Sequence, residues 1–293
     1  MDPVARDDSR LKARLKATWM AGDFGRLART IESHAEEFIA RRSIQPGQRV
    51  LDIACGTGNL AIPAAKAGGI VSGMDIATNL IAQARVRAAE QGLAIAFEEG
   101  DAEQLAYPDA AFDLVVSMYG VMFAPHPERA TAEMLRVCRP GGCIAMANWT
   151  PGGFTGQMFK LTSDYVNPPQ GLPAPVLWGD EATVRQRLAD GISSLTLTPV
   201  RVAFRFPFGV AEVVEFYRNW FGPTQRAFAL LSPERQVDYR RDMEALGVLA
   251  GAHPLAQLAR GGLGNHPSVG EVPHARQAER VERADRDGPV SFH

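Results

Sequence analysis

The sequence lacks an excess of charge of either sign. Its 293 residues carry 31 Lys and Arg against 33 Asp and Glu, so the formal net charge is only −2. A chain with this balance produces no long-range positive field that would attract a nucleic-acid backbone or an anionic membrane surface. We therefore expect neither nucleic acid nor a membrane among its partners.

Cysteine and long apolar runs are also scarce. Cys55, Cys138 and Cys143 are an odd number without a CxxC pair, which predicts reduced thiols and gives no indication of a metal site. No stretch of the sequence approaches the roughly 20 apolar residues of a transmembrane helix, and the charged start offers no signal peptide. The expected location is the cytoplasm.

What the sequence does contain is a regular alternation of strand-like and helix-like segments over residues 46–150. Each short apolar run is followed by a segment with helical periodicity. The expected strands are Arg49–Ala54, Ile70–Asp75, Ala94–Glu98, Phe112–Ser117 and Cys143–Trp149. This order predicts an α/β fold with a doubly wound, mostly parallel, Rossmann-like sheet and helices on both faces. Ligands of such sheets bind at the carboxyl ends of the strands.

Two further segments flank this core. Residues 1–45 are expected to form an N-terminal helical cap. Residues 151–246 begin with a stretch rich in proline and glycine, and we interpret them as an inserted lid together with the remaining sheet. Their expected elements are a half-buried strand at Val200–Phe208 and helices at Val213–Phe221 and Ser232–Leu246.

Residues 247–293 differ in composition from the rest of the chain. Glycine and proline recur there, and they hold His253, His266, His274 and His293 of the six histidines. We expect a poorly ordered tail without a last apolar strand. A shifted reading frame is one explanation of the abrupt change, and resequencing of the coding DNA across codon 246 tests it.

The most informative segment is the glycine turn directly after the first expected strand. Gly56 and Gly58, spaced by one residue, let a ligand approach bare main chain. This pattern also fits a dinucleotide site. Asp52, four residues before Gly56, favours a site for S-adenosylmethionine over a dinucleotide site. A carboxylate repels a pyrophosphate but attracts the ammonium and sulfonium of S-adenosylmethionine.

A second acid, Asp75, ends the second expected strand 19 residues after Gly56. At that place a carboxylate can accept hydrogen bonds from both hydroxyls of a ribose. The structural alternative is an N-cap of the helix expected from Thr78.

Several motifs together resemble class I S-adenosylmethionine-dependent methyltransferases, over roughly residues 45–150. They are Val50–Leu60, Gly73–Asp75, Gly100–Glu103, Phe112–Ser117 and Leu135–Gly142. The flanks resemble the ubiquinone/menaquinone-biosynthesis type. The resemblance implies S-adenosyl-L-methionine as cofactor, S-adenosyl-L-homocysteine as product, and a residue set that binds the cofactor. That set is Trp19, Phe24, Asp52, Ala54, Gly56, Gly58, Asp75, Ile76, Asp101, Ala102 and Ser117.

The resemblance also implies individual roles. Asp101 would accept from the adenine amino group and the backbone of Ala102 would meet the ring, with a plain turn aspartate as the structural alternative. Trp19 and Phe24 belong to a segment that closes over the cofactor in this family. Ser117 would lie beside the methionine moiety, where core packing explains it equally well.

Methyl transfer from a sulfonium proceeds by direct in-line displacement, so no dedicated catalytic residue is obligatory. His126 and Tyr119, which follow the fourth expected strand, are candidates to assist a hydroxyl or ring-carbon acceptor. A structural histidine is the alternative for His126. We expect a small-molecule acceptor, and the sequence leaves open the methylated atom and whether the chain is a monomer or a homodimer.

Two other functions are compatible with the glycine turn. An NAD(P)-dependent oxidoreductase would share this turn and Asp75, but Asp52 and the turn at Arg139–Gly142 argue against it. A methyltransferase-like protein that binds S-adenosylmethionine without turnover is the other alternative, because methyl transfer leaves no obligatory catalytic signature. Turnover with a panel of acceptors distinguishes such a binding protein from an active methyltransferase.

Overall fold

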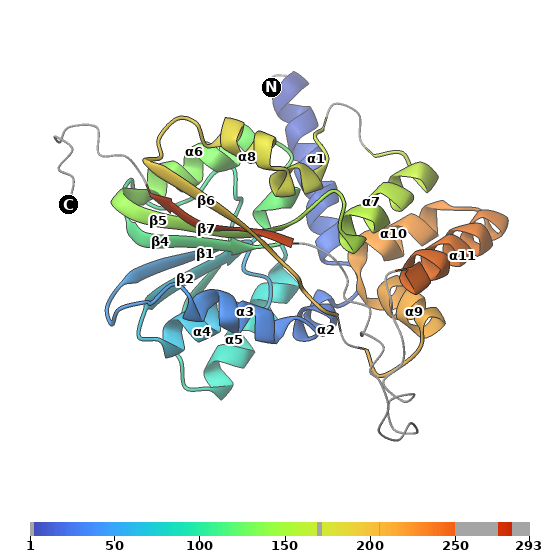
Figure 1. Cartoon of the computed structure of the whole chain (residues 1–293), viewed down its shortest axis with the longest axis horizontal. Helices are drawn as coiled ribbons and strands as arrows, with labels where there is room; N and C mark the ends of the chain where they lie inside the picture. Colours follow the sequence, from blue (N-terminus) through green and yellow to red (C-terminus); the bar gives the residue numbers. More distant parts are fainter. Residues whose placement is uncertain (1–2, 169–171, 205, 250–274, 283–293) are drawn as a thin grey trace, which may run out of the picture.

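The centre of the molecule is a seven-stranded sheet. The computed structural model describes residues 3–168, 172–204, 206–249 and 275–282. The strands are β1 (Arg49–Ile53), β2 (Ile70–Asp75), β3 (Ala96–Glu99), β4 (Phe112–Met118), β5 (Cys138–Trp149), β6 (Ser194–Val200) and β7 (Ala275–Glu282). They lie in the order β3-β2-β1-β4-β5-β7-β6 (Figure 1). The first five are parallel, whereas β7 runs antiparallel to both β5 and β6.

Helices cover both faces of the parallel part of the sheet, as the alternation predicts. α3 (Glu32–Ala40), α4 (Ala61–Lys66) and α5 (Thr78–Glu90) lie on one face, and α6 (Pro127–Val137) and α8 (Glu181–Arg187) lie on the other (Figure 1). Val50, Leu51 and Ile53 of the central strand are completely buried. A parallel strand covered on two sides is apolar throughout, which explains the unbroken apolar runs in the sequence.

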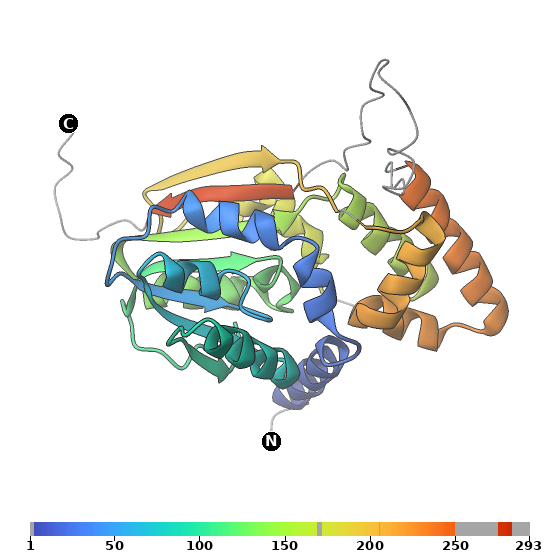
Figure 2. The same cartoon turned by 90° about the horizontal axis from the view of Figure 1, so that it is seen from below.

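A separate group of helices packs beyond the carboxyl ends of the parallel strands (Figures 1 and 2). It consists of α7 (Phe154–Tyr165), α9 (Val210–Trp220), α10 (Gly222–Leu230) and α11 (Pro233–Leu249). Buried side chains from all four helices form a second apolar cluster that includes Met158, Tyr217, Phe228 and Tyr239. α1 (Pro3–Trp19) and α2 (Phe24–Arg29) complete this end of the molecule, with the short 3₁₀ helices η1 (Val121–Phe123) and η2 (Pro175–Gly179).

The strand predicted at Val200–Phe208 is wrong in position. The sixth strand is Ser194–Val200, and the described residues after it up to Phe204 form no regular element. The alternating aromatic side chains instead contact one another, with ring centroids of Phe206 and Phe208 5.5 Å apart, and they pack against the helical cluster. Alternating apolar and polar side chains indicate an extended backbone, but only hydrogen bonds to a neighbouring strand make that segment part of a sheet.

The prediction that no strand follows Leu246 is also wrong. α11 continues to Leu249, and residues 275–282 form β7 between β5 and β6. A strand paired on both edges satisfies its backbone donors and acceptors through its neighbours, so an apolar side-chain pattern is not required for it to form. The rest of the predicted tail lies outside the described residues, and the boundaries of the four segments stay predictions.

Candidate functional site

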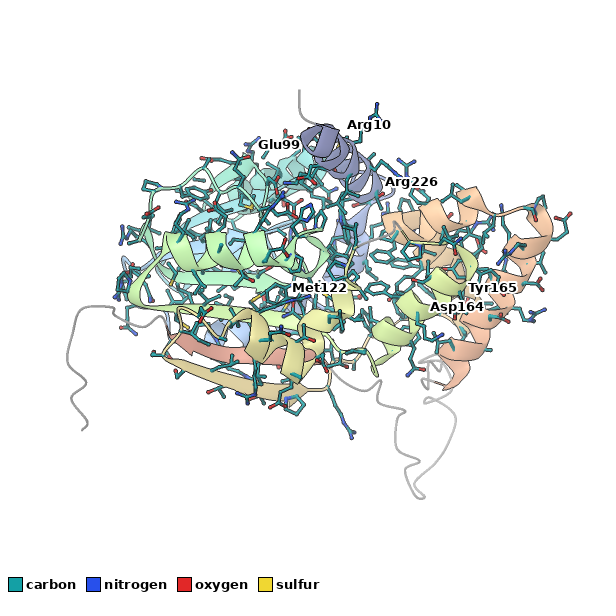
Figure 3. All side chains as sticks on the ribbon, turned by 90° about the horizontal axis from the view of Figure 1, so that it is seen from above. Arg10, Glu99, Met122, Asp164, Tyr165 and Arg226 are labelled. Atoms are coloured by element: carbon teal, nitrogen blue, oxygen red, sulfur yellow. The ribbon has the colours of Figure 1, made fainter. Side chains whose placement is uncertain are left out.

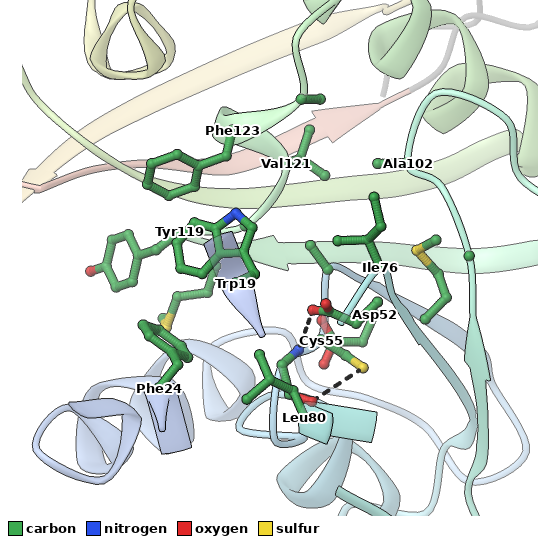
Figure 4. A pocket seen from close by; sticks show the side chains of 18 of the residues that line it. Trp19, Phe24, Asp52, Cys55, Ile76, Leu80, Ala102, Tyr119, Val121 and Phe123 are labelled. Atoms are coloured by element: carbon green, nitrogen blue, oxygen red, sulfur yellow. Dashed lines mark hydrogen bonds between the residues drawn. The ribbon is translucent and has the colours of Figure 1, made fainter. Parts of the chain in front are cut away.

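A large cavity lies at the carboxyl ends of β1 to β4. From β1 the chain continues to β2 and β3 on one side of the sheet, whereas from β4 it continues to β5 on the other. Such a switch point opens a crevice at the sheet edge. The cavity encloses about 1000 Å³, part of it open to solvent, which is in the range of ligand sites. Loops after the four strands form its walls together with α1, α2 and η1 (Figure 4).

Gly56 and Gly58 reverse the chain after β1. Their φ angles are +53° and +82°, in the left-handed region that glycine adopts without strain. The N–H of Gly58 donates to the carbonyl of Cys55 at 2.8 Å and closes the turn. Gly56 lines the cavity, whereas Gly58 lies behind it, where a β-carbon would be 3.2 Å from the ring of Phe97. The two glycines therefore have different roles, one at the ligand surface and one in the turn.

Asp52 anchors the helix that follows the turn. Its Oδ2 accepts from the N–H of Ala61, the first residue of α4, at 3.0 Å. The side chain lines the cavity but is only 1% exposed. Burial, and then the neighbouring carboxylate of Asp75, raise the pKa of Asp52 well above its usual range. A positively charged group in the cavity would favour the ionised form, whereas a pyrophosphate would oppose it.

Asp75 is held at the end of β2 by backbone donors. Its Oδ2 accepts from the N–H of Gly56 and its Oδ1 from the N–H of Ala77, each at 2.8 Å. Burial raises the pKa of the Asp75 carboxyl. The carboxylate does not cap α5, because Ala77 occupies the N-cap position. Each oxygen keeps acceptor capacity for one further donor, as a pair of ribose hydroxyls would require.

The loop after β3 carries a compact ionic cluster. Asp101 and Ala102 line the cavity, and the N–H of Glu103 donates to Oδ1 of Asp101 at 2.9 Å. Lys12 of α1 places its Nζ 2.5 Å from Oδ2 of Asp101 and 2.8 Å from Oε2 of Glu103. Lys12 also lines the cavity. The sequence analysis missed it, because nothing in the local pattern of a charged helix connects it to a loop 89 residues away.

Aromatic rings form the opposite wall. Trp19 makes edge-to-face contacts with Phe24 and Phe123, with centroid distances of 5.6 and 4.8 Å. Figure 4 shows these rings and Tyr119 on one side of the cavity, with Asp52 and Ala102 on the other. Trp19 and Phe24, which the sequence indicates, therefore line the cavity together with Phe123 and Lys12, which it does not indicate.

Comparisons with known proteins agree with this geometry. A family model described as a methyltransferase domain matches residues 50–142. An uncharacterised protein of Mycobacterium tuberculosis is 39% identical over 232 residues, which cover 78% of this chain and 84% of the relative. The demethylmenaquinone methyltransferase of Deinococcus radiodurans is 38% identical over 125 residues, 41% of this chain and 52% of that enzyme.

Residues 50–142 form a class I S-adenosylmethionine-dependent methyltransferase domain. The resemblance to the ubiquinone/menaquinone type is partial, because it spans only about half of that relative. The crystal structure of the YcgJ protein from Bacillus subtilis has the same fold, with a TM-score of 0.53 at 15% identity over 86% of this chain and all of that chain.

His126 of this methyltransferase is not at the cavity. Its Nε2 lies 2.9 Å from Oδ1 of Asp8, and its backbone N–H donates to Oε1 of Glu103 at 2.7 Å. The described residues of this loop that line the cavity end at Pro125, one residue before His126. The ring therefore tethers α1 from outside, and the structural alternative is the one this arrangement favours.

Tyr119 does line the cavity, in an unusual backbone conformation. Its φ is +56°, and its ring stacks on Trp149 with centroids 3.8 Å apart. Within the described part of the chain, its buried hydroxyl has no hydrogen-bond partner. Burial raises the pKa of Tyr119, so the phenol stays protonated at neutral pH and is a hydrogen-bond donor rather than a base.

Ser117 joins the ends of β1 and β4 in the interior. Its hydroxyl donates to the carbonyl of Ile53 at 2.8 Å and accepts from the N–H of Val121 at 3.1 Å. Its neighbour Met118, rather than Ser117, lines the cavity. Core packing, which the sequence analysis left open, is the role that these contacts support.

The two loops that meet at the switch point are in close contact. Ala54 has a φ of +55°, and a β-carbon on Gly120 would lie 2.5 Å from that of Ala54. Ala54, Ile76 and Gly120 line the cavity. Left-handed φ values at non-glycine residues cluster at functional sites. A glycine two residues after the end of β4 was the available sequence signal for Gly120.

The described part of the chain holds no group of three or more His, Cys, Asp or Glu side chains arranged to bind a metal ion. None of its helices combines the length and the hydropathy of a membrane span.

Proposed function

We propose that this methyltransferase binds S-adenosylmethionine in the cavity and transfers its methyl group to a small, neutral, largely apolar molecule. The observation that carries the cofactor assignment is Asp75, whose carboxylate is fixed by Gly56 and Ala77 and still faces the cavity. In this arrangement Asp75 would hold the ribose. The methionine moiety would lie over Gly56 beside Asp52, and the adenine would lie between Asp101 and Ala102.

The charge of the cavity supports this cofactor over a dinucleotide. Three of its lining residues are acids, Asp52, Asp75 and Asp101. Among the described lining residues, Lys12 is the single cation, and Asp101 and Glu103 already neutralise it. A pyrophosphate would therefore meet carboxylates without a free counter-charge, whereas an ammonium and a sulfonium meet complementary charge.

The wall opposite the acids supports the class of acceptor. Trp19, Phe24, Phe123 and Tyr119 present ring surface, and none of these side chains carries a charge. A phosphorylated or carboxylated acceptor would find no basic side chain there among the described residues. An ammonium acceptor would be repelled by the sulfonium and could not attack it while protonated. A neutral molecule with an apolar surface fits both constraints.

The chemistry requires mainly alignment. The cofactor supplies an electrophilic methyl group; the acceptor atom bonds to the methyl carbon as the carbon–sulfur bond breaks, and the electron pair leaves on sulfur. The aromatic wall and the glycine turn would hold the two reactants in line and exclude water. Such positioning can supply roughly 7 to 11 kcal/mol of the barrier.

Calorimetric titration of the full chain tests the cofactor assignment. We expect micromolar binding of S-adenosylmethionine and S-adenosylhomocysteine, no binding of NADH, and loss of both sulfur ligands in Asp75→Ala. Asp190→Asn, at an exposed position remote from the cavity, is the matched control and should bind like the wild type. Binding of NADH, or unchanged affinity in Asp75→Ala, would contradict the proposal.

Turnover separates an enzyme from a protein that only binds the cofactor. Release of S-adenosylhomocysteine is measured with a panel of neutral aromatic and aliphatic acceptors, with charged analogues alongside. We expect product with at least one neutral acceptor and none with its phosphorylated analogue. Preference for a phosphorylated analogue would contradict the proposed acceptor class.

A further inference from the structure

α1 is attached to the rest of the molecule at both ends. At its carboxyl end, the carbonyl of Ala17 accepts from Arg226 of α10 at 3.1 Å. Toward its amino end, Asp8 pairs with Arg129 at 2.7 Å. In its last turn, Lys16 pairs with Glu99, one helical turn after Lys12. Figure 3 shows Glu99 and Arg226 on either side of α1. The helix therefore spans the cavity between the sheet edge and the helical group.

Lys12 differs from the other charged residues of this helix. It contacts the cavity, its side chain is 23% exposed, and it pairs with the completely buried carboxylate of Glu103. The pair between Lys16 and Glu99 is more exposed, with side chains at 32% and 50%. Exposed ion pairs contribute little to stability, whereas breaking a buried pair leaves an uncompensated charge in the interior. The pair of Lys12 with Glu103 is therefore the one that affects the cavity.

We propose that Lys12 is a cofactor-positioning residue: it fixes the Asp101 carboxylate for the adenine amino group and so links α1 to cofactor binding. The inference rests on the proposed function. The Lys12 ammonium donates a hydrogen bond to Asp101 and forms an ion pair with Glu103. Asp101 is held from the other side by the N–H of Glu103, so its orientation is set from two directions.

Lys12→Met tests this, because methionine keeps much of the side-chain length and removes the charge. We expect the dissociation constant of S-adenosylhomocysteine to rise about 10-fold, the usual size of a lost charge-assisted contact, through faster dissociation. Lys12→Arg should restore most of the affinity. Lys16→Met, one turn away on the same helix, is the matched control and should bind like the wild type.

Two further measurements separate positioning from a general loss of stability. Lys12→Met alone leaves the buried carboxylate of Glu103 without a counter-ion, and the double variant Lys12→Met/Glu103→Gln removes that carboxylate. We expect the double variant to regain the unfolding temperature but not the affinity. The analogue of S-adenosylhomocysteine with unsubstituted purine in place of adenine has a hydrogen atom instead of the amino group, so Asp101 has nothing to accept. The effect of Lys12→Met on this ligand should be smaller than its effect on S-adenosylhomocysteine.

The inference is overturned if Lys12→Met binds like the wild type or if Lys16→Met loses as much affinity. It is also overturned if the loss is equal for both ligands, or if the double variant regains affinity with stability. A wild-type chain that binds no S-adenosylhomocysteine overturns the proposed function and this inference together. Wild-type binding with an unaffected Lys12→Met overturns the inference alone.

Discussion

At the scale of single residues, the cavity depends on backbone conformations that most side chains avoid. Ala54 and Tyr119, which follow β1 and β4, both have a positive φ. Gly120 follows Tyr119 and packs so closely against Ala54 that it has no room for a side chain. Strain of this kind persists only where the surroundings enforce it, and here it brings two loops together at the switch point.

Gly120→Ala tests whether that approach is required. The new β-carbon would lie 2.5 Å from the β-carbon of Ala54 and 2.8 Å from its carbonyl oxygen, so the two loops must move apart. We expect a lower unfolding temperature and at least about a 10-fold weaker affinity for S-adenosylhomocysteine, since small displacements in a binding site have large effects.

Gly152→Ala is the matched control, because a β-carbon there meets no atom within 4 Å. Its unfolding temperature and affinity should equal those of the wild type. Wild-type affinity in Gly120→Ala would show that the close contact is not needed for binding.

At the scale of the elements, one hydroxyl joins the ends of β1 and β4. Ser117→Ala would leave the carbonyl of Ile53 and the N–H of Val121 without this buried partner. The expected loss is about 1 to 3 kcal/mol in the free energy of unfolding. Denaturant unfolding measures it.

Ser163→Ala is the control for that substitution. Ser163 also donates to a backbone carbonyl, that of Phe159, but at an exposed position where water can replace it. Its free energy of unfolding should change by less than about 0.5 kcal/mol. Equal losses in the two variants would mean that burial of the Ser117 hydroxyl is unimportant.

At the scale of the whole molecule, buried acids make stability depend on pH. The pKa of Asp52 is raised in the folded protein, so ionisation favours the unfolded chain. Its stabilising contribution is fully present below the pKa of an unfolded aspartate, about 3.9, and is lost as the pH rises through the higher folded pKa.

Asp52→Asn removes this titration. In the absence of ligand, we expect the variant to gain stability relative to the wild type as the pH rises above about 4, and to bind S-adenosylmethionine more weakly at neutral pH. Thermal unfolding across this range measures the difference. Parallel pH profiles for the two proteins would refute the assignment to Asp52.

The parallel core and much of the cofactor site could be predicted because their signals are local. β2 has the predicted bounds, and Asp52, Gly56 and Asp75 lie at the cavity as their spacing indicates. β6 and β7 could not be placed, because strand pairing between segments far apart in the chain is not written in either segment. The position of His126 outside the cavity could not be predicted either, because it depends on a contact with Asp8 of α1, which is distant in the sequence.

The sequence by itself therefore determined the parallel sheet, the glycine turn and the acids at the strand ends. Each follows from apolar periodicity and residue spacing within a few tens of residues. Only the tertiary structure decided that Lys12 reaches Asp101, that Gly120 meets Ala54 and that aromatic side chains from α1, α2 and η1 form one wall. Lys12 and Asp101 are 89 residues apart in the chain, and Ala54 and Gly120 are 66 residues apart. Only packing of the folded chain brings such distant segments together.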